Sequence, residues 1–197
     1  KVQYEAMNVT IKDMKIYNFA HGGTFTIPEG EPSQSDWSGV IPIGGAYTVK
    51  KAGTDITVST TNKDEAKWIT PESTDPMLFI PQKLTKWATT PETAVSTEVA
   101  NNQKQSYLEI TLKLTQNGQY LIGSESSYQT IYVPFTNVDA TATIGWEPGK
   151  RYIYTLTFGG GYDKNGNPIL TPITFEPTVE DWKDIAGYAP EVPAYTN

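Results

Sequence analysis

The feature that most constrains the fold is a segment from Leu108 to Thr115 in which apolar and polar residues alternate without exception. Leu108, Ile110, Leu112 and Leu114 share one parity, and a period of two places them on one face of a β-strand. The polar residues between them fall on the other face. The segment therefore predicts a strand that buries one face only, as strands of antiparallel sheets commonly do.

A hairpin signal follows this strand directly. Asn117-Gly118 is the dipeptide that most favours a two-residue β-turn, and Tyr120-Leu121-Ile122 supplies a returning strand. Tyr128 to Phe135 is the next β-branched and aromatic run, and Pro134 ends it. This part of the chain is predicted to consist of short strands joined by turns.

The N-terminal part carries shorter alternating runs. Val9-Thr10-Ile11 begins one, and Met14 and Ile16 continue it on the opposite parity, which predicts a bulge or a change of face near Lys12-Asp13. Thr24 to Ile27 is predicted as a strand that returns on the preceding one.

The remaining segments complete the strand pattern. Residues 28–39 are polar and are predicted as a loop, and Met77 to Gln82 is a compact apolar run that Pro81 ends or places at a sheet edge. We count about nine or ten short strands with long loops and no amphipathic helix between them. The prediction is an all-β fold, an antiparallel β-sandwich, in one domain at residues 1–184 with a proline-rich tail at 185–197.

A second hairpin is predicted between Trp146 and Trp182. Residues 146–151 form a turn, Tyr152 to Phe158 a strand, and Ile169 to Phe175 the returning strand. The side chains that share one parity and should face the interior are Tyr152, Tyr154, Leu156 and Phe158.

Composition excludes several classes of function. The 197 residues include no cysteine, so disulfides, zinc-thiolate sites and thiol catalysis are excluded. A net charge of −7 argues against nucleic acid and against an anionic membrane surface. No apolar run approaches the roughly 20 residues of a membrane span. The chain begins at Lys1 without a Met or a signal peptide, as a mature product or a domain of a longer protein would.

Catalytic and metal-binding groups are weakly represented. His21 is the single histidine and lies beside two glycines, so a hairpin-turn residue is favoured over a general base or metal ligand. Asp163, Asn165 and Asn167 have the first spacings of a calcium loop, but the positions that need glycine and glutamate hold Pro168 and Thr174. We expect no metal and no cofactor.

Two acidic pairs are candidates for the paired catalytic carboxylates of a glycosidase. Glu29 with Glu31 and Glu180 with Asp181 both lie in stretches predicted as loops, where solvated surface is the favoured interpretation. With no Gly-x-Ser-x-Gly motif to present a serine nucleophile, we expect that the protein is not an enzyme.

Three tryptophans lie in or beside predicted loops, namely Trp37, Trp68 and Trp87. Exposed aromatic rings would form a platform on which sugars stack, which makes carbohydrate binding the alternative function. The favoured interpretation is that these rings cap the ends of the core.

The order of these motifs resembles one known family. Trp146-x-Pro-Gly-Lys-x-Tyr-x-Tyr-x-Leu156, followed by a hairpin and Val179-x-x-Trp182, resembles the C-terminal signature of fimbrillin-like proteins, the type V pilins (Mfa-like) and related surface lipoproteins of Gram-negative gut and oral anaerobes. Met77 to Gln82 is similar to an apolar strand of that family, and Val9 to Asn18 with Gly23-Thr24-Phe25 is similar to the opening strands of its C-terminal domain.

The resemblance implies a transthyretin-like, Greek-key β-sandwich in a structural or adhesive subunit of a cell-surface fimbria. It implies export as a lipoprotein to the outer membrane and trimming by a surface protease, which opens a groove that a strand of the next subunit fills. Partners are then other pilin subunits, with host or bacterial glycans or proteins as further candidates.

The tail after Trp182 is predicted to dock at the edge of a groove, on this subunit or the next. Tyr188, Val192 and Ala194 share one parity, so one face would enter a groove. Pro190 and Pro193 lack the N–H that a central strand donates, and a disordered proline-rich tail is the alternative.

Overall fold

The fold is taken from a computed structural model. It describes residues 1–2, 6–20, 22–38, 46–50, 53–59, 61, 66–69, 77–84, 105–134, 145–159 and 174–181. The strands in this part of the chain are β1 (Met7–Tyr17), β2 (Thr24–Phe25), β3 (Trp37–Ser38), β4 (Ala46–Lys50), β5 (Ile56–Val58), β6 (Gln82–Lys83), β7 (Tyr107–Gln116), β8 (Gln119–Ile122), β9 (Gln129–Pro134), β10 (Gly145–Trp146), β11 (Lys150–Thr157) and β12 (Thr174–Asp181). A 3₁₀ turn, η1 (Gln34–Asp36), precedes β3.

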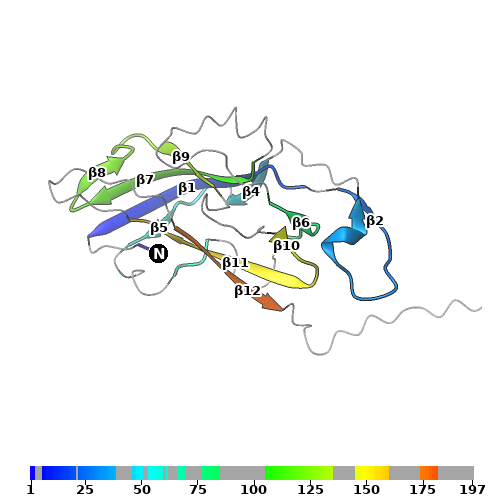
Figure 1. Cartoon of the computed structure of the whole chain (residues 1–197). Helices are drawn as coiled ribbons and strands as arrows, with labels where there is room; N and C mark the ends of the chain where they lie inside the picture. Colours follow the sequence, from blue (N-terminus) through cyan, green and yellow to red (C-terminus); the bar gives the residue numbers. More distant parts are fainter. Residues whose placement is uncertain are drawn as a thin grey trace, which may run out of the picture.

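The fold is all-β, as predicted, and its strand ladders are antiparallel (Figure 1). We expected nine or ten strands, and the described residues hold twelve, four of which have only two residues. Among these residues no helix is long and apolar enough to span a membrane.

Two long strands form the centre of the main sheet. β1 and β7 pair antiparallel from Met7 opposite Gln116 to Tyr17 opposite Tyr107. The register shifts between Ile11 and Asp13, which confirms the bulge predicted from the change of parity. The bulge explains why both Ile11 and Met14 face inward and are buried.

Shorter strands flank this pair. β5 and β4 both pair with the free edge of β1, and β8 and β9 both pair with the far edge of β7. Each edge of the sheet is therefore broken into two short strands, with residues 53–55 before β5 at one break and residues 123–128 between β8 and β9 at the other. The sheet has six strands.

The predicted turn between β7 and β8 is confirmed. Asn117 and Gly118 have φ angles of 50° and 75°, and Gln116 pairs with Gln119. Positive φ at both central positions is the property of the type I′ turn, whose twist matches that of a two-stranded ribbon.

The two edge insertions meet across the outer face of the sheet. The Tyr128 hydroxyl, from one insertion, donates to the Asp55 carboxylate, from the other, and this hydrogen bond raises the pKa of Tyr128. Lys12 and Lys113 place their Nζ atoms 5.1 Å and 4.4 Å from the centre of the Tyr128 ring. These contacts, of the cation–π kind, lie at the same level as the bulge in β1.

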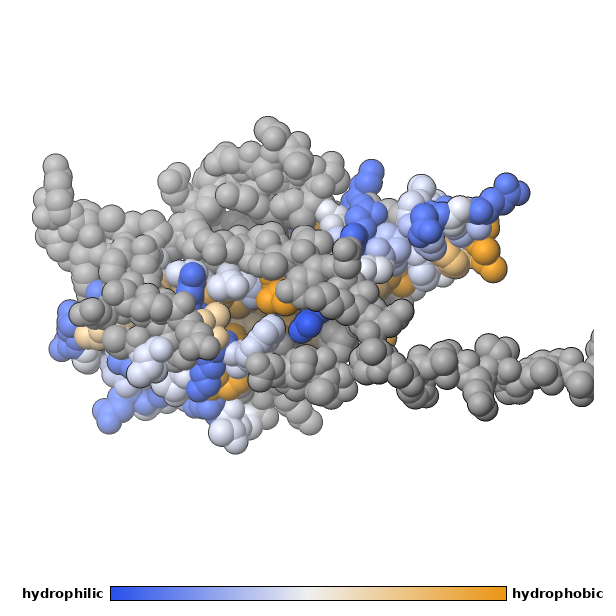
Figure 2. Space-filling model, turned by 90° about the horizontal axis from the view of Figure 1, so that it is seen from below, coloured by the Kyte–Doolittle hydropathy of each residue, from blue (hydrophilic) through white to orange (hydrophobic). Residues whose placement is uncertain are grey.

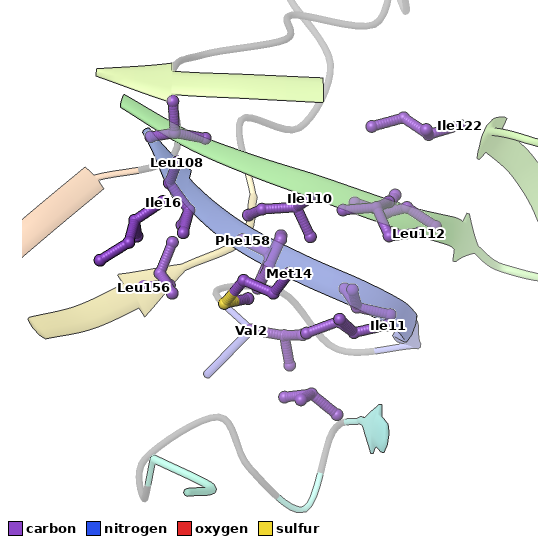
Figure 3. Close-up of a cluster of buried hydrophobic side chains, with 14 of the residues drawn as sticks. Val2, Ile11, Met14, Ile16, Leu108, Ile110, Leu112, Ile122, Leu156 and Phe158 are labelled. Atoms are coloured by element: carbon purple, nitrogen blue, oxygen red, sulfur yellow. The ribbon is translucent and has the colours of Figure 1, made fainter. Parts of the chain in front are cut away.

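The core lies between the inner face of the six-stranded sheet and the β11–β12 ribbon (Figures 1 and 3). The apolar residues of β1 and β7 meet Leu156 and Phe158 there, and Phe158 is almost completely buried. The members that Figure 3 labels are Val2, Ile11, Met14, Ile16, Leu108, Ile110, Leu112, Ile122, Leu156 and Phe158. The inward parity predicted for β7 is confirmed by this packing.

Two strand predictions were wrong. Thr24 to Ile27 does not return on β1; only Thr24 and Phe25 are in a strand, and β2 pairs with β3, which contains the Trp37 assigned to a loop. Of the apolar run from Met77 to Gln82, only Gln82 lies in a strand. Sequence parity shows that a segment suits a strand but does not name its partner.

Gln82 fixes β6 against the end of β1. Its side chain is buried and accepts from the Ala20 N–H at 2.8 Å, while its Nε2 donates to the oxygens of Ala20 at 3.1 Å and Ile80 at 3.0 Å. The Gln82 amide thus supplies a partner to both the buried backbone donor and the acceptor of Ala20.

We predict that Gln82→Leu lowers the free energy of unfolding by roughly 2–5 kcal/mol, because the buried N–H and C=O of Ala20 each lose a partner. Denaturant unfolding followed by tryptophan fluorescence measures the change. Gln119→Leu, on an exposed position of β8, is the matched control and should change the free energy by less than about 0.5 kcal/mol. Equal effects of the two substitutions would contradict the role given to Gln82.

Candidate functional site

The candidate site is the edge of β11 that faces away from β12. β11 and β12 pair antiparallel from Lys150 opposite Asp181 to Thr157 opposite Thr174. The pairing of strands predicted after Trp146 is therefore present, and its described second strand is Thr174–Asp181. Of the predicted returning strand Ile169 to Phe175, residues 169–173 lie outside the described residues.

The N-terminal residues show how this edge accepts a strand. The Lys1 amine donates to the Leu156 oxygen at 2.8 Å, and the Phe158 N–H donates to the Lys1 oxygen at 2.9 Å. Val2 forms a parallel bridge with Phe158, and its side chain is fully buried in the core. This edge thus combines main-chain hydrogen bonds with a position for an apolar side chain.

The direction of these bonds gives the orientation of the whole of β11. Residues opposite each other in an antiparallel pair alternate between those that exchange hydrogen bonds and those that do not. Because Leu156 directs its C=O to Lys1, Tyr152 and Tyr154, on the same parity, direct their main-chain groups to the same outer edge. The parallel bridge between Val2 and Phe158 lies on that edge.

This alternation also explains a proline within β12. Pro177 lies opposite Tyr154, at a position where the two strands exchange no hydrogen bond. Its missing N–H therefore costs the β11–β12 ladder nothing, and a strand containing proline is accommodated.

An aromatic cluster holds β11 at its start. The Trp146 Nε1 donates to the Tyr154 hydroxyl at 2.7 Å, and the Glu147 N–H donates to the Tyr152 hydroxyl at 2.8 Å. The Trp146 ring in turn stacks on Phe19 at 4.7 Å between ring centres. Tyr152 and Tyr154 thus face the core, as predicted, and their hydroxyls hold the turn that precedes the strand.

Burial shifts the acidity of one of these tyrosines. Loss of solvent raises the pKa of Tyr154 to about 12, and the hydrogen bond from Trp146 opposes that rise. The side chain of Tyr154 is therefore a neutral phenol in the folded state at neutral pH. The cluster is a structural support for the edge, with no group prepared for proton transfer.

The structure places the predicted glycan-stacking residues apart. Trp37 is half-buried in β3, with its ring centre 5.1 Å from that of Phe25, whereas Trp68 is 43% exposed beside Lys67, which binds the Thr57 oxygen of β5. β3 follows the Tyr17 end of β1, and β5 pairs with its opposite half, so these two rings share no platform. Trp87 lies outside the described residues.

The remaining candidates divide into three groups. His21, the Asp163 to Asn167 loop and the tail residues Tyr188, Val192 and Ala194 lie outside the described residues. Glu29 and Glu31 are exposed in a loop, as expected. Glu180 and Asp181, assigned to a loop, are instead the last residues of β12.

Among the residues that the structure describes, no cluster of three or more histidine, aspartate or glutamate side chains is arranged to hold a metal ion.

The pairing of Val2 with Phe158 was not predicted. The two residues are far apart in the sequence, and Lys1 and Val2 alone are too short to show a strand pattern. The apolar character of Val2 was the only available signal, and a single apolar residue does not identify a partner.

Comparison with known proteins identifies one family. A family model described as fimbrillin-like matches residues 1–182 of the chain. No curated protein and no solved structure matches it.

We predict an alkaline loss of stability that depends on Tyr154. Its folded-state pKa lies above the ordinary value of 10.0, so its contribution is complete below about pH 10 and is lost as the pH rises through about 12. Relative to Tyr154→Phe, the wild type should lose roughly 2 kcal/mol of unfolding free energy over that interval. Denaturant titrations at successive pH values measure it. Tyr120→Phe, on an exposed ring, should keep the wild-type pH dependence; if Tyr154→Phe does so too, the assignment is wrong.

Proposed function

This chain belongs to the fimbrillin-like family, and from that premise we propose that it is a structural subunit of a cell-surface fimbria that assembles by β-strand addition. The observation that carries the proposal is the pairing of Lys1 and Val2 with the outer edge of β11. A strand laid along this edge gains main-chain hydrogen bonds and a buried apolar position at once. A family of structural pilins gives no reason to look for an enzyme.

The geometry defines what the added strand must supply. Side chains of one parity enter the core beside Leu156 and Phe158, and the other parity faces outward. The added strand forms main-chain hydrogen bonds along one side only, because it lies at an edge of the β11–β12 ribbon. It therefore needs free N–H groups on that side alone. Pro190 and Pro193 have opposite parity, so one of them faces β11 without an N–H and the added strand forms one main-chain hydrogen bond fewer there.

The tail at residues 185–197 is the donor in this proposal. Tyr188, Val192 and Ala194 lie on one parity and would enter the core of the next subunit. Attachment of the assembled fimbria to the outer membrane through a lipid and trimming by a surface protease belong to the same proposal. The chain is then one domain at 1–184 followed by its donor strand.

We predict that deletion of residues 185–197 abolishes self-association or lowers the melting temperature. Analytical ultracentrifugation and thermal unfolding measure the two outcomes. If neither changes, the tail is not the donor strand.

A matched pair of variants tests the parity. The triple substitution Tyr188→Ser, Val192→Ser and Ala194→Ser removes the inward apolar groups and should weaken self-association at least tenfold, because each buried side chain contributes about 1–3 kcal/mol. The control replaces Ala189, Glu191 and Tyr195 by Ser and leaves the inward face intact. Equal behaviour of the two triple variants would show that the tail does not enter a groove as a strand.

Carbohydrate binding is the second candidate, and the exposure of Trp68 is the observation that favours it. A single ring stacks on one sugar and gives weak, saturable binding. We predict that glycans which quench tryptophan fluorescence lose this effect in Trp68→Ala and keep it in Trp37→Ala, because the Trp37 ring is packed against Phe25. Quenching that persists in Trp68→Ala would exclude this ring.

A further inference from the structure

The segment that begins with β5 has a composition that favours pairing with an identical segment. Residues 56–61 read Ile-Thr-Val-Ser-Thr-Thr and include no charged residue, proline or glycine. Five of the six are β-branched, and short segments of this composition pair strand to strand with copies of themselves when their main chain is accessible. A chain that carries such a segment at a sheet edge needs a means of covering it.

β5 lies at an edge of the main sheet. One side of β5 pairs with β1, where Thr57 is opposite Thr10. In an antiparallel pair, every second residue directs its main-chain groups away from the partner strand. Thr57 is such a residue, because its oxygen accepts a hydrogen bond from the Nζ of the exposed Lys67 at 2.9 Å. The outer edge of β5 therefore has a side-chain ammonium where a neighbouring strand would otherwise supply an N–H.

Residues 66–69, which we call the edge guard, carry this ammonium. They belong to no strand, so they cover the β5 edge without extending the sheet. Ile69 packs against the core and fixes one end of the guard, while Lys67 reaches Thr57. Trp68, between these two residues, is 43% exposed. The guard is thus anchored on both sides of an outward-facing ring.

The main chain of β5, rather than its side chains, needs this cover. Val58 is 1% exposed and Ile56 packs against the core. More exposed apolar groups lie on another part of the molecule, the projection formed by residues 22–38, where Ile27 is 85% exposed. Figure 2 shows hydrophobic atoms at the outer end of that projection, at the upper right. A strand added to β5 would therefore be held by main-chain hydrogen bonds and not by an apolar patch.

A lysine opposes such pairing for two physical reasons. Its ammonium satisfies the Thr57 oxygen, so the edge offers one acceptor fewer to an N–H of another chain. It also places a charge where the backbone of an added strand would lie, and that charge would have to lose its contact with water. Pairing at this edge therefore requires that the ammonium be displaced first.

We propose that the edge guard, acting through Lys67, prevents the β5 edges of two copies of the chain from pairing. The partner that it excludes is a second copy, because residues 56–61 are suited to pair with an identical segment. Two such edges pair antiparallel about a twofold axis, and Thr57 then lies opposite the same residue of the second copy. The inference goes beyond the proposed function, since it concerns an edge other than that of β11 and holds whether or not strands add there.

The substitution Thr57→Cys reports this pairing, because the natural chain has no cysteine. Opposite residues that exchange hydrogen bonds have Cα atoms about 5.5 Å apart, a separation that a disulfide spans. In the full chain with Thr57→Cys we expect little disulfide-linked dimer after mild oxidation. Adding Lys67→Met should raise the yield about tenfold, the factor that corresponds to one hydrogen bond of a charged group. Non-reducing electrophoresis measures the yield.

Two further variants control for charge and for the loss of a lysine. Lys67→Arg keeps a donor for the Thr57 oxygen and should leave the dimer yield low, and Lys83→Met removes an exposed lysine of β6 and should not change it. Because Lys67 is exposed, Lys67→Met should lower the melting temperature by less than about 2 °C. A yield that Lys67→Met does not raise, or that Lys67→Arg or Lys83→Met raises equally, overturns the proposal.

A charge placed on β5 itself gives an independent test. Self-association of the Lys67→Met chain, measured by sedimentation, should exceed that of the wild type. Adding Thr57→Lys should return it to the wild-type value, because two lysines would lie opposite each other across the pair. Thr48→Lys, at an exposed position of β4, is the matched control and should not do so. Equal effects of the two added lysines, or no effect of either, overturn the proposal.

The tail deletion separates this inference from the proposed function. Deletion of residues 185–197 removes the donor strand proposed for β11 but leaves β5 and the edge guard unchanged. The dimer yield of the chain with Thr57→Cys and Lys67→Met should therefore persist in the deleted chain, whatever the deletion does to the remaining association. A yield that falls with the tail would assign the contact to strand addition at β11 and overturn the inference.

Discussion

The pairing of β1 with β7 is the interaction on which the rest of the structure depends. It is the longest ladder in the described residues, and both strands contribute the inner face on which Leu156 and Phe158 pack. Side chains extend the pairing past the end of β1, where the Asn18 Nδ2 donates to the Gln105 oxygen at 2.8 Å and the Ser106 Oγ donates to the Asn18 oxygen at 3.1 Å. Every other strand of the main sheet is placed by this pair, and through the shared core so is β11, whose edge is the candidate site.

Sequence patterns correctly predicted the elements whose conformation is set by residues close together in the sequence. The alternation in β7, the Asn117-Gly118 turn and the bulge in β1 each depend on neighbouring residues only, and each is confirmed. Strand partners were harder to predict, because parity places a side chain on one face of a strand but does not identify the neighbouring strand. Thr24 and Phe25 were therefore assigned to the wrong partner strand, and the run before Gln82 was assigned to a strand although only Gln82 of that run lies in one.

The candidate site was partly predictable. The inward parity of Tyr152 and Tyr154 follows from alternation, and their packing on the core confirms it. The N-terminal contact with Phe158 joins residues separated by almost the whole described chain, and no local pattern encodes such a pairing. The role of the tail stays a prediction, because it rests on the resemblance to fimbrillin-like proteins and on the parity of residues beyond those described.

The broken edges of the main sheet have a consequence for a member of the fimbrillin-like family. A long, flat edge strand is a template for uncontrolled sheet growth between molecules. Here β4 and β5 on one side, and β8 and β9 on the other, interrupt both edges at the same level, and the insertions are joined through Tyr128 and Asp55. Neither edge of the main sheet therefore presents a long, flat strand in the described residues, and this protects the sheet against amyloid-like stacking between molecules.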